Sequence, residues 1–164
     1  MTFSSCRPST YTSGGKLIGF EKPQTGVAAP STGTYDRHLY MDGAGVIWFG
    51  VYNGGDFALR SAGALNDNAW HMAVGTMSAA GMRLYIDGAL VASNANATGE
   101  STTGWWRAGC GNLAGWGNEW TGANSPGTTS TTAANRPFLG SLDEITVLNS
   151  ALTAANVSFL YWIR

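Results

Sequence analysis

Apolar and polar residues alternate along most of the chain, and a two-residue period is typical of β-strands. Within residues 82–87, for example, Met82, Leu84 and Ile86 would face one way and the residues between them the other. Gly, Asn, Asp and Ser interrupt these runs about every 8–12 residues, as turns do in all-β proteins. We therefore expect strands at Lys16–Phe20, Arg37–Met41, Val46–Tyr52, Phe57–Ser61, His71–Met77, Met82–Asp87, Leu90–Ser93, Trp106–Cys110 and Leu139–Leu148.

The spacing of these runs also predicts turns and loops. Asp87-Gly88 has the composition of a two-residue hairpin turn. Val46–Tyr52 is apolar on both sides, which places it in the middle of a sheet with material covering each face. Two long loops are expected at Glu21–Asp36 and Gly111–Pro137. Loops of that length in a compact domain are often functional.

Helical signal is confined to the C-terminal end of the chain. Ala151–Leu160 has apolar residues, among them Val157, that would seat a short helix, with Ser150 or Thr153 as its N-cap. The fold class that follows is all-β: a two-sheet antiparallel jelly-roll sandwich with one short C-terminal helix. The 164 residues suit a single domain spanning 1–164.

Composition and charge exclude some functions. The chain is 44% hydrophobic and only 12% charged, and its net charge is -1. A surface that binds phosphates needs a basic excess, so the balance argues against nucleic acid. No apolar run has the length of a membrane span or a signal peptide. Without an export signal of its own, the chain is expected to be part of a larger exported protein or of a virion, and so to be extracellular or surface-exposed.

The two cysteines leave two alternatives open. Cys6 and Cys110 allow one intramolecular disulfide in an oxidising compartment, which would tie the N-terminal segment to the strand near Cys110. Otherwise both remain free thiols.

Three sequence blocks occur in an order that resembles a known family. They are WHMAVG at Trp70–Gly75, MRLYIDGALVAS at Met82–Ser93 and FLGSLDEITVLNSALTAANV at Phe138–Val157. Together they resemble the laminin G-like branch of the concanavalin A-like lectin/glucanase superfamily. The resemblance implies a jelly roll whose members are mostly binding modules rather than enzymes.

The resemblance begins inside the expected fold, at about Gly14. Such domains usually have one or two earlier strands, where this chain has the polar segment Thr2–Thr10. Either this segment is a diverged strand, or the first strands are missing and come from a partner. An incomplete sheet edge is a template for pairing with another chain. Self-association, or binding to a host protein or virion, is therefore expected in the second case.

Catalysis is not expected from the residues present. Glucanases of the superfamily use carboxylates two residues apart on a strand, so that both face the substrate. Asp143 and Glu144 are adjacent, and strict alternation would turn them to opposite faces. The two histidines offer no catalytic arrangement: His71 is expected to be structural, and His38 to face solvent. We expect no catalytic residues.

The resemblance also implies a Ca²⁺ ion held by an acid in the Leu-Asp-Glu strand, which is Asp143 here. A hard cation needs six or more oxygen ligands, so loop groups would have to join it. Asp36 and Asn112, from the two long loops, are the candidates.

Aromatic side chains are the candidates for a carbohydrate ligand. Sugar rings present apolar C–H faces that stack on Trp or Tyr, while amides and guanidinium groups hydrogen-bond the hydroxyls. The expected stacking residues are Trp105, Trp116, Trp120 and Tyr35, and the expected polar partners are Arg37 and Asn118. Trp48, Trp70 and Trp106 are expected in the core.

The expected function is a non-catalytic binding or adhesion module, with carbohydrate or a surface glycan as its ligand. The alternative is a structural or assembly protein, such as the surface decoration of a virion or filament, built on the same jelly roll. A glucanase-like enzyme is a third alternative, which the arrangement of acids disfavours.

Overall fold

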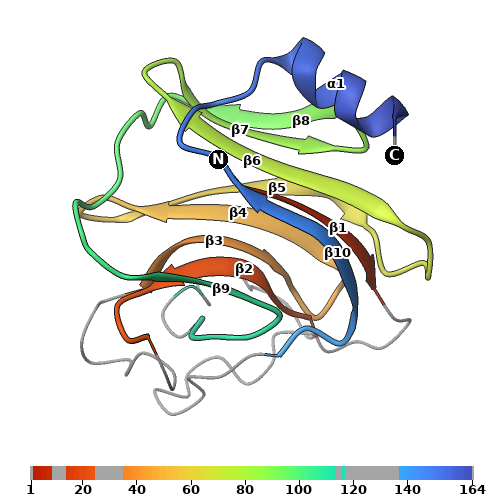
Figure 1. Cartoon of the computed structure of the whole chain (residues 1–164), viewed down its shortest axis with the longest axis horizontal. Coiled ribbons are helices and arrows are strands. Elements are labelled where there is room, and N and C mark those ends of the chain that lie inside the picture. The colour runs from red at the N-terminus through yellow and green to blue at the C-terminus, as the bar shows by residue number, and fades with distance from the viewer. Residues whose placement is uncertain (1, 9–13, 25–34, 114–115, 117–136, 164) are drawn as a thin grey trace.

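The computed structural model describes residues 2–8, 14–24, 35–113, 116 and 137–163, with only the backbone path given for 2–8. Within them, ten strands form two five-stranded antiparallel sheets that lie face to face (Figure 1). The arrangement is the two-sheet jelly-roll sandwich that the alternation predicts.

Each sheet is built from strands that are distant in the sequence. Sheet A has the order β10 (Gly140–Val147), β1 (Thr2–Pro8), β6 (His71–Ser78), β7 (Gly81–Ile86) and β8 (Ala89–Asn94). Sheet B has the order β5 (Asp56–Ala64), β4 (Val46–Tyr52), β3 (Tyr35–Met41), β2 (Gly15–Glu21) and β9 (Trp105–Ala108). All nine predicted strands are present, with no end shifted by more than three residues.

Strand β1 decides between the two alternatives for the N-terminal segment. It lies between β6 and β10, with Thr2 opposite both Gly75 and Val147. Residues 2–8 are thus the diverged strand, and this chain supplies it itself. The edges of sheet A are β8 and β10, and those of sheet B are β5 and β9.

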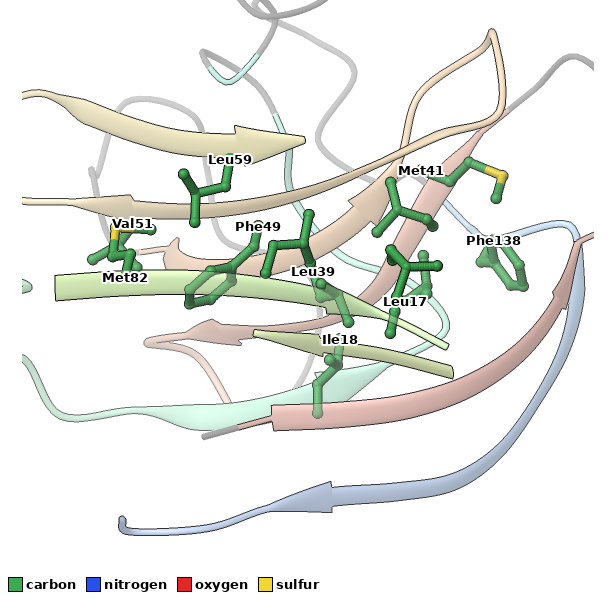
Figure 2. Packing of buried hydrophobic residues seen from close by; sticks show 13 residues of the cluster. Leu17, Ile18, Leu39, Met41, Phe49, Val51, Leu59, Met82 and Phe138 are labelled. Atoms are coloured by element: carbon green, nitrogen blue, oxygen red, sulfur yellow. The ribbon is translucent and has the colours of Figure 1, made fainter. Parts of the chain in front are cut away.

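The main core fills the space between the sheets (Figure 2). Alternate residues of β4, namely Ile47, Phe49 and Val51, point into it and are buried. On the opposite side of the same strand, Trp48 is also buried, packed against Tyr40 and Leu113. Strand β4 is therefore covered on both faces, as its composition predicts.

Helix α1 (Ala154–Trp162) covers the outer side of sheet A (Figure 1). Thr153 caps it, because its side chain accepts a hydrogen bond from the backbone N–H of Asn156. Val157 is buried against Met72, Val74 and Tyr85. The predicted helix, its Thr153 cap and its buried Val157 are all confirmed. No helix among the described residues has the length and apolar character to cross a membrane.

Two of the three tryptophans expected in the core lie elsewhere. Trp48 is buried, but Trp70 and Trp106 are exposed. Trp70 precedes the first residue of β6, so the sheet does not cover it. Trp106 does face the inner side of sheet B, but it belongs to the edge strand β9, where the sandwich is open.

Of the two alternatives for the cysteines, the structure favours free thiols over a Cys6–Cys110 disulfide. Cys110 carries a free thiol and is half-buried. The side chain of Cys6 lies outside the described residues.

Candidate functional site at the end of sheet B

Three side chains form a row across the end of sheet B. Glu21 of β2 is paired with Trp105 of β9 on one side and with Tyr35 of β3 on the other. Directly paired residues of antiparallel strands project from the same face. This is the outer face, because the next residue pair, Phe20 and Trp106, faces the space between the sheets. Trp105 is 50% exposed and Tyr35 is half-buried.

Glu21, the middle residue of this row, also belongs to a buried ion pair. Lys16 Nζ donates to Glu21 Oε1 at 2.7 Å, and both side chains are fully buried. The backbone N–H of Asn112 donates to the same oxygen at 2.6 Å, and Arg107 Nε lies 3.7 Å from Oε2. Burial lowers the pKa of Lys16 to about 8, against the opposing charge of Glu21. The cluster fixes residue 112 against β2 and holds the Glu21 side chain in place in the strand between Trp105 and Tyr35.

A β-bulge in β3 sets the direction of Arg37. Residues 36–39 oppose only residues 18–20 of β2, and Arg37 has a φ of 53°. Bulges of this kind re-aim a side chain within a sheet. The Arg37 guanidinium lies over the Phe20 ring, 5.5 Å from its centroid, on the inner side of sheet B. Its Nη2 donates to the Glu100 carbonyl oxygen.

Asp36 holds this bulge in place. Its Oδ1 accepts hydrogen bonds from the backbone N–H groups of Arg37 at 2.6 Å and Tyr52 at 2.7 Å. Its Oδ2 lies 3.0 Å from Arg37 Nη1. Burial raises the pKa of Asp36, although these hydrogen bonds and Arg37 oppose the effect. In this position Asp36 is a structural anchor of Arg37.

On the outer side of sheet B, His38 and Trp116 pack against each other and are both buried. The expectation of a solvent-facing His38 is wrong: the side chain is fully buried, and neither ring nitrogen has a hydrogen-bond partner among the described residues. Burial, with a further contribution from Lys16, holds the pKa of His38 well below its ordinary value. Trp116 packs edge-on to His38, with ring centroids 4.9 Å apart, and it lies on Gly50. Alternation gives the correct face for His38, but Trp116 covers that face.

An open cavity of about 500 Å³ lies on the inner side of sheet B, between the two sheets. Its lining combines apolar residues of four strands with Arg37 at one end. The lining residues are Arg37, Phe49, Val51, Gly75, Met77, Trp106, Val147, Leu148 and Asn149. Trp105 and Trp106, adjacent in β9, therefore belong to different surfaces: Trp105 to the outer face and Trp106 to the cavity.

The expected site residues are thus divided among several places. Tyr35 and Trp105 share the outer row, Arg37 lies at the inner cavity, and Trp116 is buried. Trp120 and Asn118 lie outside the described residues. Residue types and spacing alone do not predict the Lys16–Glu21 pair or the cavity, because both depend on how distant strands pair and pack.

The three expected calcium ligands do not form one group. Asp143 is exposed on β10 of sheet A, and its Oδ1 accepts from the backbone N–H of Glu144 at 2.8 Å. Asp36 is paired with Arg37, and Asn112 is held beside Lys16, so both have a positive charge nearby. Among the described residues, no three His, Cys, Asp or Glu side chains gather as a metal site would require. The calcium ion, with Asp143, Asp36 and Asn112 as its ligands, stays a prediction.

The two adjacent acids of β10 do not follow strict alternation. The register with β1 shifts between Phe3 and Ser5, and Glu144 has a φ of 51°. Asp143 and Glu144 are both exposed, while Leu142 and Ile145 on either side of them pack against the core. The assumption that the two carboxylates take opposite faces therefore does not hold at this bulge.

Solved structures with the same fold include a domain with a bound sugar, a pentraxin and a sialidase. The Ruminococcus gnavus IT-sialidase CBM40 bound to α2,3-sialyllactose is 16% identical, with a TM-score of 0.60 over 98% of this chain and 81% of that chain. A heptameric SAP-like pentraxin from Limulus polyphemus is 15% identical, with a TM-score of 0.60 over 98% and 68%. A Trypanosoma rangeli sialidase in complex with difluorosialic acid is 14% identical, with a TM-score of 0.57 over 98% and 22%. At these identities the likeness shows the fold alone.

Sequence comparison identifies the family. No curated protein matches the chain. A laminin G family model, described as concanavalin A-like lectin/glucanases superfamily, matches residues 7–158 and includes the three blocks that carry the resemblance. The chain therefore belongs to the concanavalin A-like lectin/glucanases superfamily.

Proposed function

We propose that this chain is a non-catalytic carbohydrate-binding module that holds a sugar against Trp105 on the outer face of sheet B. The observation that carries the proposal is the half-exposed Trp105 ring, in one row with Glu21 and Tyr35. A large aromatic side chain on an edge strand, open to solvent beside polar groups, suits the C–H face of a sugar ring.

The spacing of the row fits an oligosaccharide better than a single ring. Trp105 and Tyr35 are two strands apart, so their backbones are separated by about 10 Å, twice the usual distance between neighbouring strands. The Tyr35 hydroxyl and the Arg107 guanidinium are hydrogen-bonding groups on the same face as Trp105. Because Lys16 and Arg107 offset the charge of Glu21, the face does not repel neutral or acidic sugars.

The structural neighbours support the same class of ligand. The Ruminococcus gnavus CBM40 was solved with sialyllactose, and the sialidase with a sialic acid analogue. The chain spans 22% of that sialidase, so the enzyme as a whole is not a guide to this chain. A surface-exposed or extracellular location fits a module of this kind.

The test is a glycan array followed by calorimetric titration of the best ligand, with two adjacent variants. Trp105→Ala removes the ring from the outer face, and we expect about tenfold weaker binding from the loss of one stacked aromatic. Trp106→Ala is the matched control, because the same residue type is removed one position away on the inner side. Unchanged affinity in Trp105→Ala, or equal losses in both variants, would contradict the proposal.

A structural or assembly role is the second candidate, and a different surface favours it. Phe159, Trp162 and Ile163 are exposed on or just after α1, and no residue of Ala154–Trp162 is charged. An apolar surface of this kind is common at protein contacts. Light scattering would separate the two functions: a stable oligomer that Trp162→Ser dissociates favours assembly, whereas a monomer favours the binding module. The calcium ion predicted at Asp143 is compatible with both proposed functions and does not distinguish them.

A further inference from the structure

We propose that the cavity between the two sheets is a second binding site, which takes a small apolar molecule carrying one acidic oxygen group. The proposal goes beyond glycan binding: it concerns the inner side of sheet B, whereas the sugar is placed on the outer face. The two sites share strand β9, to which Trp105 and Trp106 contribute adjacent residues.

The size of the cavity is the first argument. Protein interiors are packed to crystal-like density, and voids larger than a water molecule are few. A space of about 500 Å³ is well above such packing defects. It falls within the range of roughly 300–1,000 Å³ found for pockets that enclose small molecules.

The side chains that line the cavity also suit an apolar ligand. Phe49, Val51 and Met77 form apolar walls, and the partly exposed Trp106 ring also lines the cavity. Gly75 allows the Phe49 ring to pack directly on β6, because a Cβ there would lie 2.5 Å from that ring. Walls of this kind favour the body of an apolar molecule, since burial removes its surface from water.

The Arg37 guanidinium is the reason to expect an acidic group on the ligand. The side chain of Arg37 is 24% exposed, whereas that of its partner Asp36 is 1% exposed. A molecule in the cavity therefore meets the guanidinium and not the carboxylate. The contacts to Asp36 and Glu100 use one N–H each, and a guanidinium has five. The remaining N–H groups suit a carboxylate or sulfonate oxygen.

The arrangement of Arg37 adds to the argument. A non-glycine residue with positive φ is uncommon, and the Asp36 hydrogen bonds hold Arg37 in that conformation. Arg37 lies on the inner side of β3, as Leu39 does two residues later, while His38 between them faces outward. The contacts with Asp36 thus hold the Arg37 guanidinium beside an apolar space.

The test uses anilinonaphthalene sulfonate, whose apolar rings and single sulfonate match this chemistry and whose fluorescence rises in an apolar site. We expect saturable binding with one site per chain. Val147→Trp fills the cavity from β10, and we expect at least tenfold weaker binding. Val91→Trp is the matched control: Val147 is 36% exposed and Val91 is 38% exposed, and each lies on an edge strand of sheet A.

Further variants separate the cavity from other surfaces. Arg37→Met should weaken binding of the sulfonate more than binding of uncharged anilinonaphthalene. Trp162→Ser, on the apolar surface at α1, should leave binding unchanged, and near-ultraviolet circular dichroism should show native packing in every variant. Equal affinities in Val147→Trp and Val91→Trp, or loss of binding in Trp162→Ser, would overturn the proposal. The glycan test reads out Trp105, so each proposal can fail without the other.

Discussion

Replacing Lys16 by Met tests whether the buried ion pair holds the end of sheet B together. The Lys16 ammonium and the Glu21 carboxylate are both fully buried, and Lys16 Nζ lies 2.7 Å from Glu21 Oε1. Met keeps the apolar stem but removes the charge, so Glu21 is left as a buried anion with weaker partners. Removing one member of a buried pair typically costs about 3–5 kcal/mol.

The surroundings of Glu21 place the expected loss at the lower end of that range. The Asn112 N–H still donates to its carboxylate, and the Arg107 guanidinium lies 3.7 Å away. We therefore expect Lys16→Met to lower the free energy of unfolding by about 3 kcal/mol. For a domain of this size that corresponds to a melting temperature lower by about 6–12 °C.

The reverse substitution should cost less. Glu21→Gln leaves Lys16 buried without a carboxylate, but Lys16 can lose its proton because burial already lowers its pKa to about 8. The double variant Lys16→Met/Glu21→Gln, which has no buried charge at this position, should recover most of the stability of the wild type. Urea denaturation of the four proteins at neutral pH measures the coupling between the two residues.

The pH dependence gives a separate check. The pKa of Lys16 in the folded protein is about 8 and its ordinary value is 10.5, so the unfolded chain binds more protons between these values. Stability contributed by Lys16 therefore rises with pH across that window, and Lys16→Met lacks this contribution. Additive losses in the single and double variants, or a stability gap that narrows from pH 8 to 10.5, would refute the reasoning.

Two further predictions concern sheet A. Partial burial lowers the pKa of His71, but the hydrogen bonds and charges of Asp87 and Asp67 outweigh it and raise the pKa above 6.5. The stability that protonated His71 contributes is fully present below pH 6.5 and is lost as pH rises through the pKa of the folded protein. His71→Gln should therefore destabilise the protein more in mild acid than in alkali. An equal loss of stability at both pH values would contradict this prediction. Asp143→Ala should lower the melting temperature more in calcium buffer than in chelator if this carboxylate binds Ca²⁺, and equal losses would exclude the metal.

The strands were predictable from the sequence because their signal is local. Alternation identified both faces of β4, and Thr153 identified the start of α1. Strand β1 was ambiguous because Thr2–Pro8 is largely polar and has no apolar face of its own. Its place depends on pairing with β6 and β10, which lie more than sixty residues away.

The candidate site was less predictable, because it depends on departures from regular geometry. Two residues with positive φ, Arg37 and Glu144, lie at β-bulges, and neither is a glycine that would mark such a position. Burial of His38 depends on Trp116, which crosses from a distant loop. Sequence reasoning could select Trp105, Tyr35 and Arg37 by residue type, but not the faces to which they belong.

The division of these residues between two faces follows from how an edge strand differs from a central one. In a central strand such as β4, both faces are covered, so Trp48 is buried. Among the described strands, β9 has a neighbour on one side only, and the same alternation leaves Trp105 and Trp106 exposed on opposite faces. Under the two proposals, this one short strand would contact a sugar on the outer face and an apolar molecule between the sheets. Occupancy of one site should then affect the other only through the backbone of β9, and the Trp105→Ala and Trp106→Ala variants allow that coupling to be measured directly.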